Sequence, residues 1–149
     1  MLATVIATTR FGSVEVPAGD LIHFPEGLVG LPGNEYGLIG AERGPFTWLQ
    51  SLTEPEIALP LTDPRRFFPN FTLDISESEG HRLSLEPGET TEIFVTVRAT
   101  AVATDCTANL RAPILVRGPA GSGPRSAHQV LNQAPGAALR VPLFSGALI

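Results

Sequence analysis

The stretch Thr107-Ala-Asn-Leu-Arg-Ala-Pro-Ile-Leu-Val-Arg117 decides how this chain folds. It begins as a polar corner and continues as an inner strand over residues 113–117, in which neighbouring side chains face opposite sides. Pro113 has no N–H to offer a ladder, so we expect it at the start of that strand or at a bulge. Asn109 is a polar residue inside an apolar segment. We expect its amide to hold the backbone of the corner, as Asn commonly does in turns.

The segments around this stretch predict further short strands. A long alternating run, residues 92–101, precedes it, and a loop rich in Gly, Pro and Ser, residues 118–125, follows it. Other strands are expected at residues 2–8, 13–16, 21–24, 36–39, 46–51, 57–61, 71–75 and 127–131. Pro60 falls inside one of them, which predicts an edge strand or a bulge. In the turns, Gly27 and Gly30 are expected to supply positive φ or a close backbone approach.

Only short helices are predicted. Asp63 as N-cap and Pro64 at the first position indicate one helical turn that ends before Pro69. Residues 76–80 are expected to form an exposed turn or a short helix. With 15 Gly and 14 Pro, the chain has turn signals throughout. The sequence therefore predicts an all-β fold: a small antiparallel β-barrel or sandwich over residues 1–149, one domain, with little helix and an irregular tail after about residue 135.

The charge of the chain favours a protein partner over a nucleic acid. Ten basic residues, all arginines, stand against fifteen acidic ones, which gives a net charge of -5. Phosphate-binding surfaces carry clustered positive charge and an overall basic balance, so direct nucleic-acid binding is disfavoured. An acidic surface is complementary to a basic protein.

No segment indicates export or membrane insertion. The first ten residues have no basic region ahead of an apolar run, and the longest apolar runs are too short to cross a bilayer. Cys106 is the only cysteine, so an internal disulfide is impossible. We therefore expect a cytoplasmic protein without membrane contacts.

No catalytic, cofactor or metal site is predicted. Cys106 with His81 or His128 does not match a known nucleophile signature, and the three histidines are isolated from other ligand-type residues. Acidic residues in the loops are more simply solvated carboxylates than an acid–base pair. An enzyme that uses Cys106 and a β-barrel that binds a small ligand remain as alternatives. An RNA-binding barrel is a weaker one, because basic residues are not interleaved with exposed aromatics.

Several motifs, taken in order, resemble the flagellar assembly factor family FliW. They cover nearly the whole chain at similar spacing, and six in sequence are far more specific than any one alone. They are Arg10-Phe-Gly12, Phe24-Pro-Glu-Gly-Leu-x-Gly30, Pro45-Phe-x-Trp-Leu-Gln-Ser51, Thr62-Asp-Pro64 with Phe67-Phe-Pro69 and Phe71, Thr107-Ala-Asn-Leu-x-Ala-Pro-Ile114, and Gln129-Val130. Arg140-Val-Pro-Leu143 is similar to the family's closing motif.

The resemblance implies a β-barrel-like protein that acts by binding and is not an enzyme. Family members bind flagellin, and they also bind the translational repressor CsrA away from its RNA site. Flagellin and CsrA compete for the factor, which couples flagellin translation to flagellin export. The resemblance thus implies two protein partners, flagellin and CsrA, and no cofactor. A flagellin chaperone without CsrA regulation is the narrower alternative.

Candidate partner-binding residues follow from this interpretation. Adjacent aromatics on a short turn have two interpretations: one fills the core while the other covers a sheet edge, or one is an exposed anchor for a partner. We expect flagellin at an apolar patch around Phe67, Phe68 and Phe71. CsrA is expected at an acidic surface formed by Glu26, Asp63, Glu77 and Glu79. Asn109 and Arg111, at the corner, are further candidates, with Asn109 more structural than Arg111.

Overall fold

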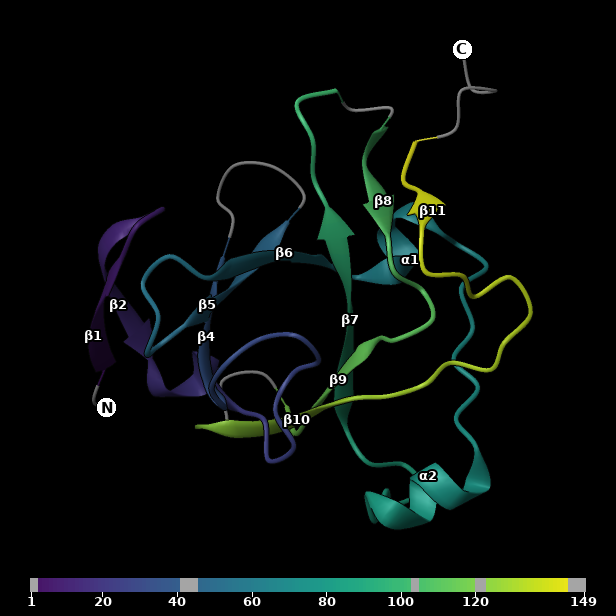
Figure 1. Cartoon of the computed structure of the whole chain (residues 1–149). Coiled ribbons are helices and arrows are strands. Elements are labelled where there is room, and N and C mark those ends of the chain that lie inside the picture. Colours follow the sequence, from purple (N-terminus) through teal and green to yellow (C-terminus); the bar gives the residue numbers. More distant parts are fainter. Residues whose placement is uncertain (1–2, 41–45, 103–104, 120–122, 145–149) are drawn as a thin grey trace.

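The protein is seen here as a computed structural model that describes residues 3–40, 46–102, 105–119 and 123–144 (Figure 1). Part of the predicted motif at Pro45 lies outside these residues. The helical elements are a 3-10 turn η1 (Ala18–Asp20), α1 (Pro64–Phe67) and α2 (Glu77–Arg82). The strands are β1 (Ala3–Thr8), β2 (Gly12–Pro17), β3 (Leu21–His23), β4 (Glu35–Ile39), β5 (Thr47–Ser51), β6 (Ala58–Thr62), β7 (Thr91–Arg98), β8 (Thr107–Ala108), β9 (Ile114–Arg117), β10 (Arg125–Gln129) and β11 (Val141–Pro142).

Seven strands close into a barrel in the order β7-β6-β5-β4-β3-β10-β9, and β9 returns to β7. The predicted all-β barrel is confirmed. Its neighbouring strands run antiparallel with one exception, the parallel pair β3–β10, in which Arg125 lies opposite Ile22. Because about a hundred residues separate these two strands in the chain, no tight turn forces them to be antiparallel.

The corner at residues 109–113 forms because β7 pairs with two strands on one side. Thr91 to Phe94 pair with β9, and Val97 and Arg98 pair with β8. The five residues between β8 and β9 therefore bulge out, and Asn109 holds them. Its Oδ1 accepts the N–H of Arg111 at 3.0 Å and of Ala112 at 3.1 Å. The predicted structural role of Asn109 is confirmed, and Pro113 directly precedes β9 as expected.

Apolar side chains fill the barrel. Large residues from different strands and from the loop after β3 are almost completely buried there: Ile22, Phe24, Tyr36, Leu49, Leu61 and Ile114, each at most 1% exposed. The rings of Phe24 and Tyr36 meet edge to face with centroids 5.6 Å apart. The Tyr36 hydroxyl donates to the Pro32 carbonyl at 2.8 Å, which satisfies the polar end of a buried ring.

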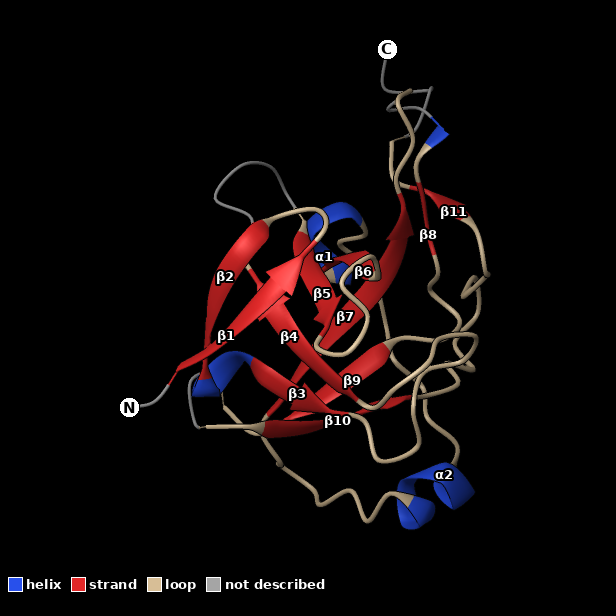
Figure 2. Cartoon of the chain, turned by 60° about the vertical axis from the view of Figure 1, so that its left-hand side comes forward, coloured by secondary structure: helices blue, strands red, loops and turns tan. Residues whose placement is uncertain are grey.

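The hairpin of β1 and β2 forms a separate two-stranded sheet that lies beside β4 (Figure 2). A Cβ atom on Gly37 of β4 would lie 3.0 Å from Cγ1 of Val16 on β2. The glycine is required by this close approach and not by its backbone angles. Val16 is 1% exposed, so the contact anchors the hairpin.

Residues 71–75 do not form the predicted strand. Their backbone bonds to residues 132–133 instead of to a strand ladder. The buried Asn132 donates from Nδ2 to the carbonyls of Thr72 (3.0 Å) and Leu110 (3.1 Å). Its Oδ1 accepts the N–H of Asp74 (2.9 Å) and of Ala134 (3.1 Å). One side chain thus joins three segments, and the alternation of residues 71–75 reflects packing alone.

Pro60 lies in a strand that has neighbours on both sides, and not in an edge strand. β6 lies between β5 and β7, but its pairing with β7 involves only Leu61 and Thr62. Pro60 therefore lies where the strand has β5 as its one paired neighbour, and its missing N–H leaves no ladder position on the β7 side unfilled.

The helices follow their sequence signals. Asp63 Oδ1 accepts the N–H of Arg65 at 2.9 Å at the start of α1, as predicted. Residues 77–82 form the short helix α2, with the hydroxyl of Ser76 accepting the N–H of Glu79 at 3.2 Å. Figures 1 and 2 show α2 at the lower end of the molecule and α1 well apart from it, beside β6.

Replacing Asn132 tests how much its four side-chain hydrogen bonds contribute. Asn132→Ala leaves two N–H groups and two carbonyls without these partners, so we expect unfolding to become easier by roughly 2–5 kcal/mol. Urea denaturation followed by circular dichroism measures this difference. Asn70→Ala is the matched control, because Asn70 is exposed. A similar small change in both variants would contradict the role assigned to Asn132.

Candidate protein-binding surfaces

The predicted aromatic residues lie together in one concavity, which we call the phenylalanine pocket. Its volume is about 380 Å³, and it is lined by Phe67, Phe68 and Phe71 together with Leu110 and residues 132–137. Phe67 and Phe68 are half-buried, and Phe71 is 9% exposed. The turn α1 sets the directions of these side chains.

Ring contacts give the phenylalanine pocket a firm rim. Phe67 meets Phe144 edge to face with centroids 5.5 Å apart and lies 6.3 Å from Phe46. The guanidinium of Arg65 lies over the Phe71 ring at 5.8 Å from its centroid. The pocket is therefore preformed, which lowers the ordering cost for a partner that enters it.

The structure brings three of the four predicted acidic residues together around α2. Glu77 and Glu79 belong to α2, and Glu26 forms an ion pair with Arg82 of the same helix. Asp63 is not part of this group, because it caps α1, which lies apart from α2 (Figure 1). Sequence distance alone does not reveal that residue 26 lies beside residue 82.

The charge of this acidic group is partly compensated. Arg82 offsets the charge of Glu26, and Glu79 Oε1 accepts the N–H of Leu131 at 3.0 Å. Glu77 is exposed and makes no ion pair within the described part of the chain. Glu77 is thus the member of the group best placed to offer an uncompensated charge.

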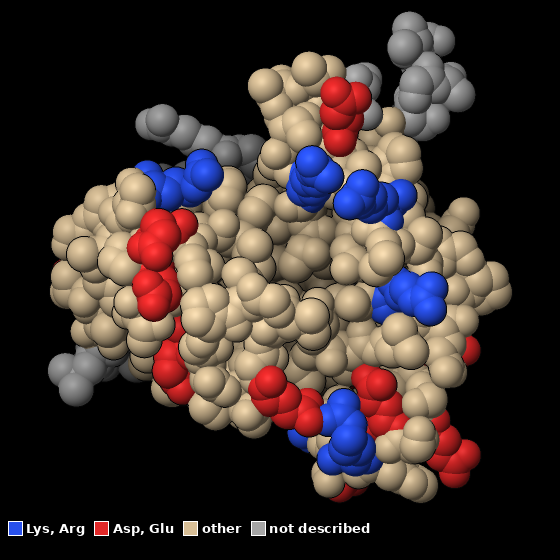
Figure 3. All heavy atoms as spheres, viewed as in Figure 1, with Lys and Arg blue, Asp and Glu red and all other residues tan. Residues whose placement is uncertain are grey.

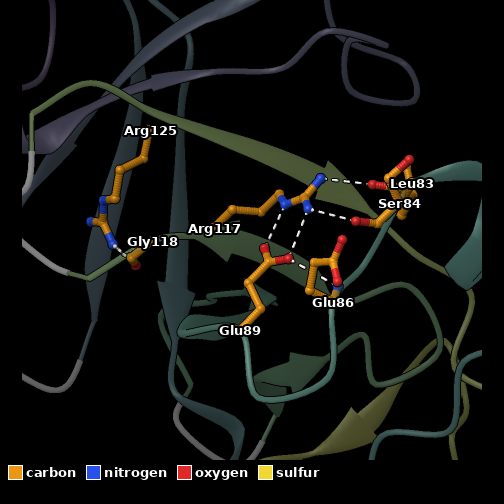
Figure 4. Close-up of polar contacts among 7 residues, drawn as sticks. All are labelled: Leu83, Ser84, Glu86, Glu89, Arg117, Gly118 and Arg125. Atoms are coloured by element: carbon orange, nitrogen blue, oxygen red, sulfur yellow. Dashed lines mark hydrogen bonds and ion pairs between the residues drawn. The ribbon is translucent and has the colours of Figure 1, made fainter.

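An ion pair fastens the segment after α2 to the barrel (Figure 4). Arg117 of β9 donates from Nε and Nη2 to the two carboxylate oxygens of Glu89, at 2.6 and 2.8 Å. The same guanidinium donates to the carbonyls of Leu83 (2.7 Å) and Ser84 (3.1 Å). The hydrogen bonds from Arg117 lower the pKa of Glu89 below its ordinary value. This arrangement fixes where α2 lies.

His128 is a buried titratable group beside this ion pair. It is 8% exposed, and its Nδ1 lies 3.7 Å from Glu26 Oε1. Burial lowers the pKa of His128, and the positive charges of Arg117 and Arg82 act in the same direction. Glu26 opposes the shift without reversing it. His128 is therefore neutral at neutral pH.

A second concavity, which we call the barrel mouth, was missed by sequence reasoning. Its volume is about 740 Å³, and its lining includes Leu28, Val29, Leu131, Leu139, Arg98 and Arg140. Figure 3 shows a hollow near the middle of this face, with basic side chains gathered along its upper and right-hand rim. Asn109 also lines it, and Arg111 is exposed close by in the chain. The sequence offered one signal for this surface: Val29 is an apolar residue in a turn, between Gly27 and Gly30.

The described residues supply no arrangement that supports the enzyme alternative. Cys106 is 5% exposed, and its thiol lies near the carbonyls of Thr100 (3.8 Å) and Val102 (3.9 Å) rather than near a histidine. A thiol in such surroundings lacks the cation that activates a nucleophile. No group of three ligand-type side chains suited to a metal occurs within the described residues. Among the helices of the described chain, none has the length and apolar character to span a membrane.

Comparisons with known proteins all lead to one family. The family model of the FliW protein matches residues 4–143. The flagellar assembly factor FliW of Bdellovibrio bacteriovorus is 33% identical over 143 residues, which are 95% of this chain and 79% of that relative. The one from Caldanaerobacter subterraneus is 38% identical over 112 residues, 73% of this chain and 75% of that relative. A crystal structure of the flagellar assembly factor FliW superposes with a TM-score of 0.79 at 27% identity, covering 95% of this chain and 98% of that one.

The architecture defines a small closed-barrel β protein with preformed apolar concavities at its surface. The match to the family model and the identity to full-length relatives then decide the assignment. The chain belongs to the FliW family of flagellar assembly factors, as the sequence motifs implied. This is not a known enzyme family.

The lowered pKa of His128 predicts a loss of stability on mild acidification. Below the ordinary histidine value of 6.5 the unfolded chain binds a proton more readily than the folded chain. The free energy of unfolding should therefore decline as the pH falls below 6.5, until the pKa of the folded state is passed. Glu89, whose lowered pKa acts below 4.5, contributes only at more acidic pH. Urea denaturation at a series of pH values measures the slope.

His128→Gln should flatten this decline, because the titrating group is removed while the size is kept. His81→Gln, the same substitution at an exposed position on α2, is the variant for comparison. An unaltered slope in His128→Gln would show that another group causes the pH dependence.

Proposed function

We propose that this protein binds flagellin and the translational regulator CsrA in the cytoplasm, each excluding the other, and thereby couples flagellin translation to export. Membership in the FliW family and the preformed phenylalanine pocket support the proposal. Binding is the whole of the mechanism, and no cofactor takes part in it.

Flagellin is proposed to dock at the phenylalanine pocket. The observation that carries this assignment is that Phe67, Phe68 and Phe71, which the sequence predicts as an apolar patch, line one concavity. Aromatic residues with preformed shape are the usual centres of binding energy in protein interfaces. Asn109 and Arg111 are proposed to contact a partner from the corner after β8, where Asn109 lines the barrel mouth and Arg111 is exposed.

CsrA is proposed to dock at the acidic group around α2. Glu77, Glu79 and Glu26 come from two segments that the Glu26–Arg82 ion pair holds together. Asp63 lies apart from this group and is proposed to contact a partner only beside the phenylalanine pocket, near α1. A net charge of -5 favours a basic partner and disfavours direct contact with nucleic acid.

The narrower alternative, a flagellin chaperone without CsrA regulation, is supported by the partial compensation of the acidic group. A barrel that binds a small ligand inside is less well supported, because buried side chains fill the interior. These alternatives differ in what the protein binds, so direct binding measurements distinguish them.

Isothermal titration of the protein with flagellin and CsrA from the same organism tests the proposal. We expect binding to each partner, and we expect saturation with one to abolish the heat of binding to the other. Raising the salt concentration should weaken CsrA binding strongly and flagellin binding little, since salt screens charges and not apolar contacts. Binding to flagellin alone would leave only the chaperone function, and binding to neither would refute the proposal.

Matched variants locate the two surfaces. Phe68→Ala should weaken flagellin binding by about ten-fold or more, as expected for an aromatic at the centre of an interface. Its control is Val5→Ala, an exposed apolar residue on β1. Glu77→Gln should weaken CsrA binding and leave flagellin binding intact, whereas Glu15→Gln on β2 should change neither. Equal effects of Phe68→Ala and Val5→Ala on flagellin binding would show that flagellin binds at another surface.

A further inference from the structure

We propose that the barrel mouth is a third interaction surface, which binds an acidic amphipathic helix of a protein partner. The proposal concerns a different surface from the phenylalanine pocket and the α2 group, and it does not depend on flagellin or CsrA. It rests on the shape of the mouth, its exposed apolar residues and its unpaired arginines.

The mouth opens where two barrel strands separate. β6 and β7 pair only through Leu61 and Thr62 with Thr96 and Val95. Residues 58–60 of β6 continue without a β7 partner, and the end of β7 is paired only on its other side, with β8. The space between them is lined by Leu59, Thr96 and Arg98. The mouth is thus a consequence of strand register, and the strands on both sides hold it open.

Exposed apolar side chains concentrate at this opening. Val29 is 89% exposed, Leu139 61% and Leu131 44%, and all three line the mouth. They make up half of the six large apolar residues exposed within the described chain. Leu28 lies deeper and is 7% exposed. Burying the three exposed residues under a partner would release water from apolar surface, which favours binding.

The charge of the mouth is opposite to that of the whole chain. Its lining includes Arg98 and Arg140, and none of the described residues that line it is acidic. Both arginines are exposed, and within the described residues neither forms an ion pair. On a chain with a net charge of -5, this local positive rim favours carboxylates. An occupant with apolar residues on one face and acidic residues beside them matches both features.

The lining also fixes the class of occupant. Among the described residues that line the mouth none is aromatic, so these residues offer no stacking platform for nucleic-acid bases. Fatty acids are usually held in cavities that bury most of the ligand, whereas the interior behind this mouth is filled by side chains. A helix that lies in an open groove needs only a row of apolar contacts along one face.

Gln129 keeps the two sides of the mouth together. Its Nε2 donates to the Ala112 carbonyl at 3.2 Å, and its Oε1 accepts the N–H of Val29 at 3.4 Å. The side chain thus connects the corner after β8 to the loop that carries Val29. The apolar contacts of the mouth are therefore set in place before a partner arrives.

Titration of the ¹⁵N-labelled full chain with a designed peptide tests the proposal, because amide shifts detect weak binding and locate it. The probe is a peptide of ~18 residues with Leu on one helical face and Glu beside it, long enough to form a helix. We expect shifts at residues 28–31, 96–98 and 131. Arg98→Glu and Arg140→Glu should each weaken binding about five-fold, and Val29→Ser about ten-fold.

Control variants away from the mouth test whether the loss of binding is specific to it. Arg66→Glu reverses one exposed charge on α1, and Val5→Ser removes one exposed apolar residue on β1, so neither should change the affinity more than about two-fold. A peptide with Lys in place of Glu should not bind. Absence of shifts at the mouth, equal binding of the Lys peptide, or an equal loss in Arg66→Glu would overturn the proposal. Oleate producing the same shifts while the acidic peptide does not would assign the mouth to fatty acids instead.

Discussion

The rest of the structure depends on the pairing of β7 with three other strands. Its first four residues pair with β9, its middle with β6 and its last two residues with β8. The pairing with β9 closes the barrel and seals a core of nearly fully buried side chains. It also forces residues 109–113 to bulge, where Asn109 satisfies the freed N–H groups. The short contact with β6 leaves the barrel mouth open. One strand therefore determines both the closed interior and the concave surface.

The segment between β6 and β7 is held to the barrel by polar contacts rather than by strand pairing. Asn132 binds its first part through the backbone of Thr72 and Asp74. Arg117 binds its last part through Glu89 and the carbonyls after α2. The phenylalanines of the pocket precede the first of these fastenings in the chain, and α2 lies between the two. Buried polar groups of this kind specify one arrangement, because leaving any of them unpaired is costly.

The surfaces of the molecule differ in chemistry and lie on different parts of the barrel. Aromatic residues form a preformed pocket beside α1, acidic residues gather at α2, and arginines rim an apolar mouth. A protein that acts by binding benefits from such separation, since a change at one surface need not alter another. The filled interior agrees with this arrangement: the barrel serves as a rigid support, and the three surfaces lie on its rim, loops and short helices.

The sequence by itself determined the class of fold, most strand positions, the helix start at Asp63 and the roles of Asn109 and Pro113. Turn chemistry and alternation act between near neighbours, which is why local sequence is enough for these features. For residues 76–80 it left a turn and a short helix as alternatives. It also identified the family through motifs that the comparisons confirmed. It misplaced a strand at residues 71–75, because Asn132, about sixty residues away, takes the backbone bonds that a ladder would use. Tertiary structure alone decided which residues share a surface: that Glu26 meets Arg82, that Asp63 lies apart, and that Val29, Arg98 and Leu139 meet at one mouth. The physical reason is that strand register and barrel closure join distant segments, and local sequence carries no record of these pairings.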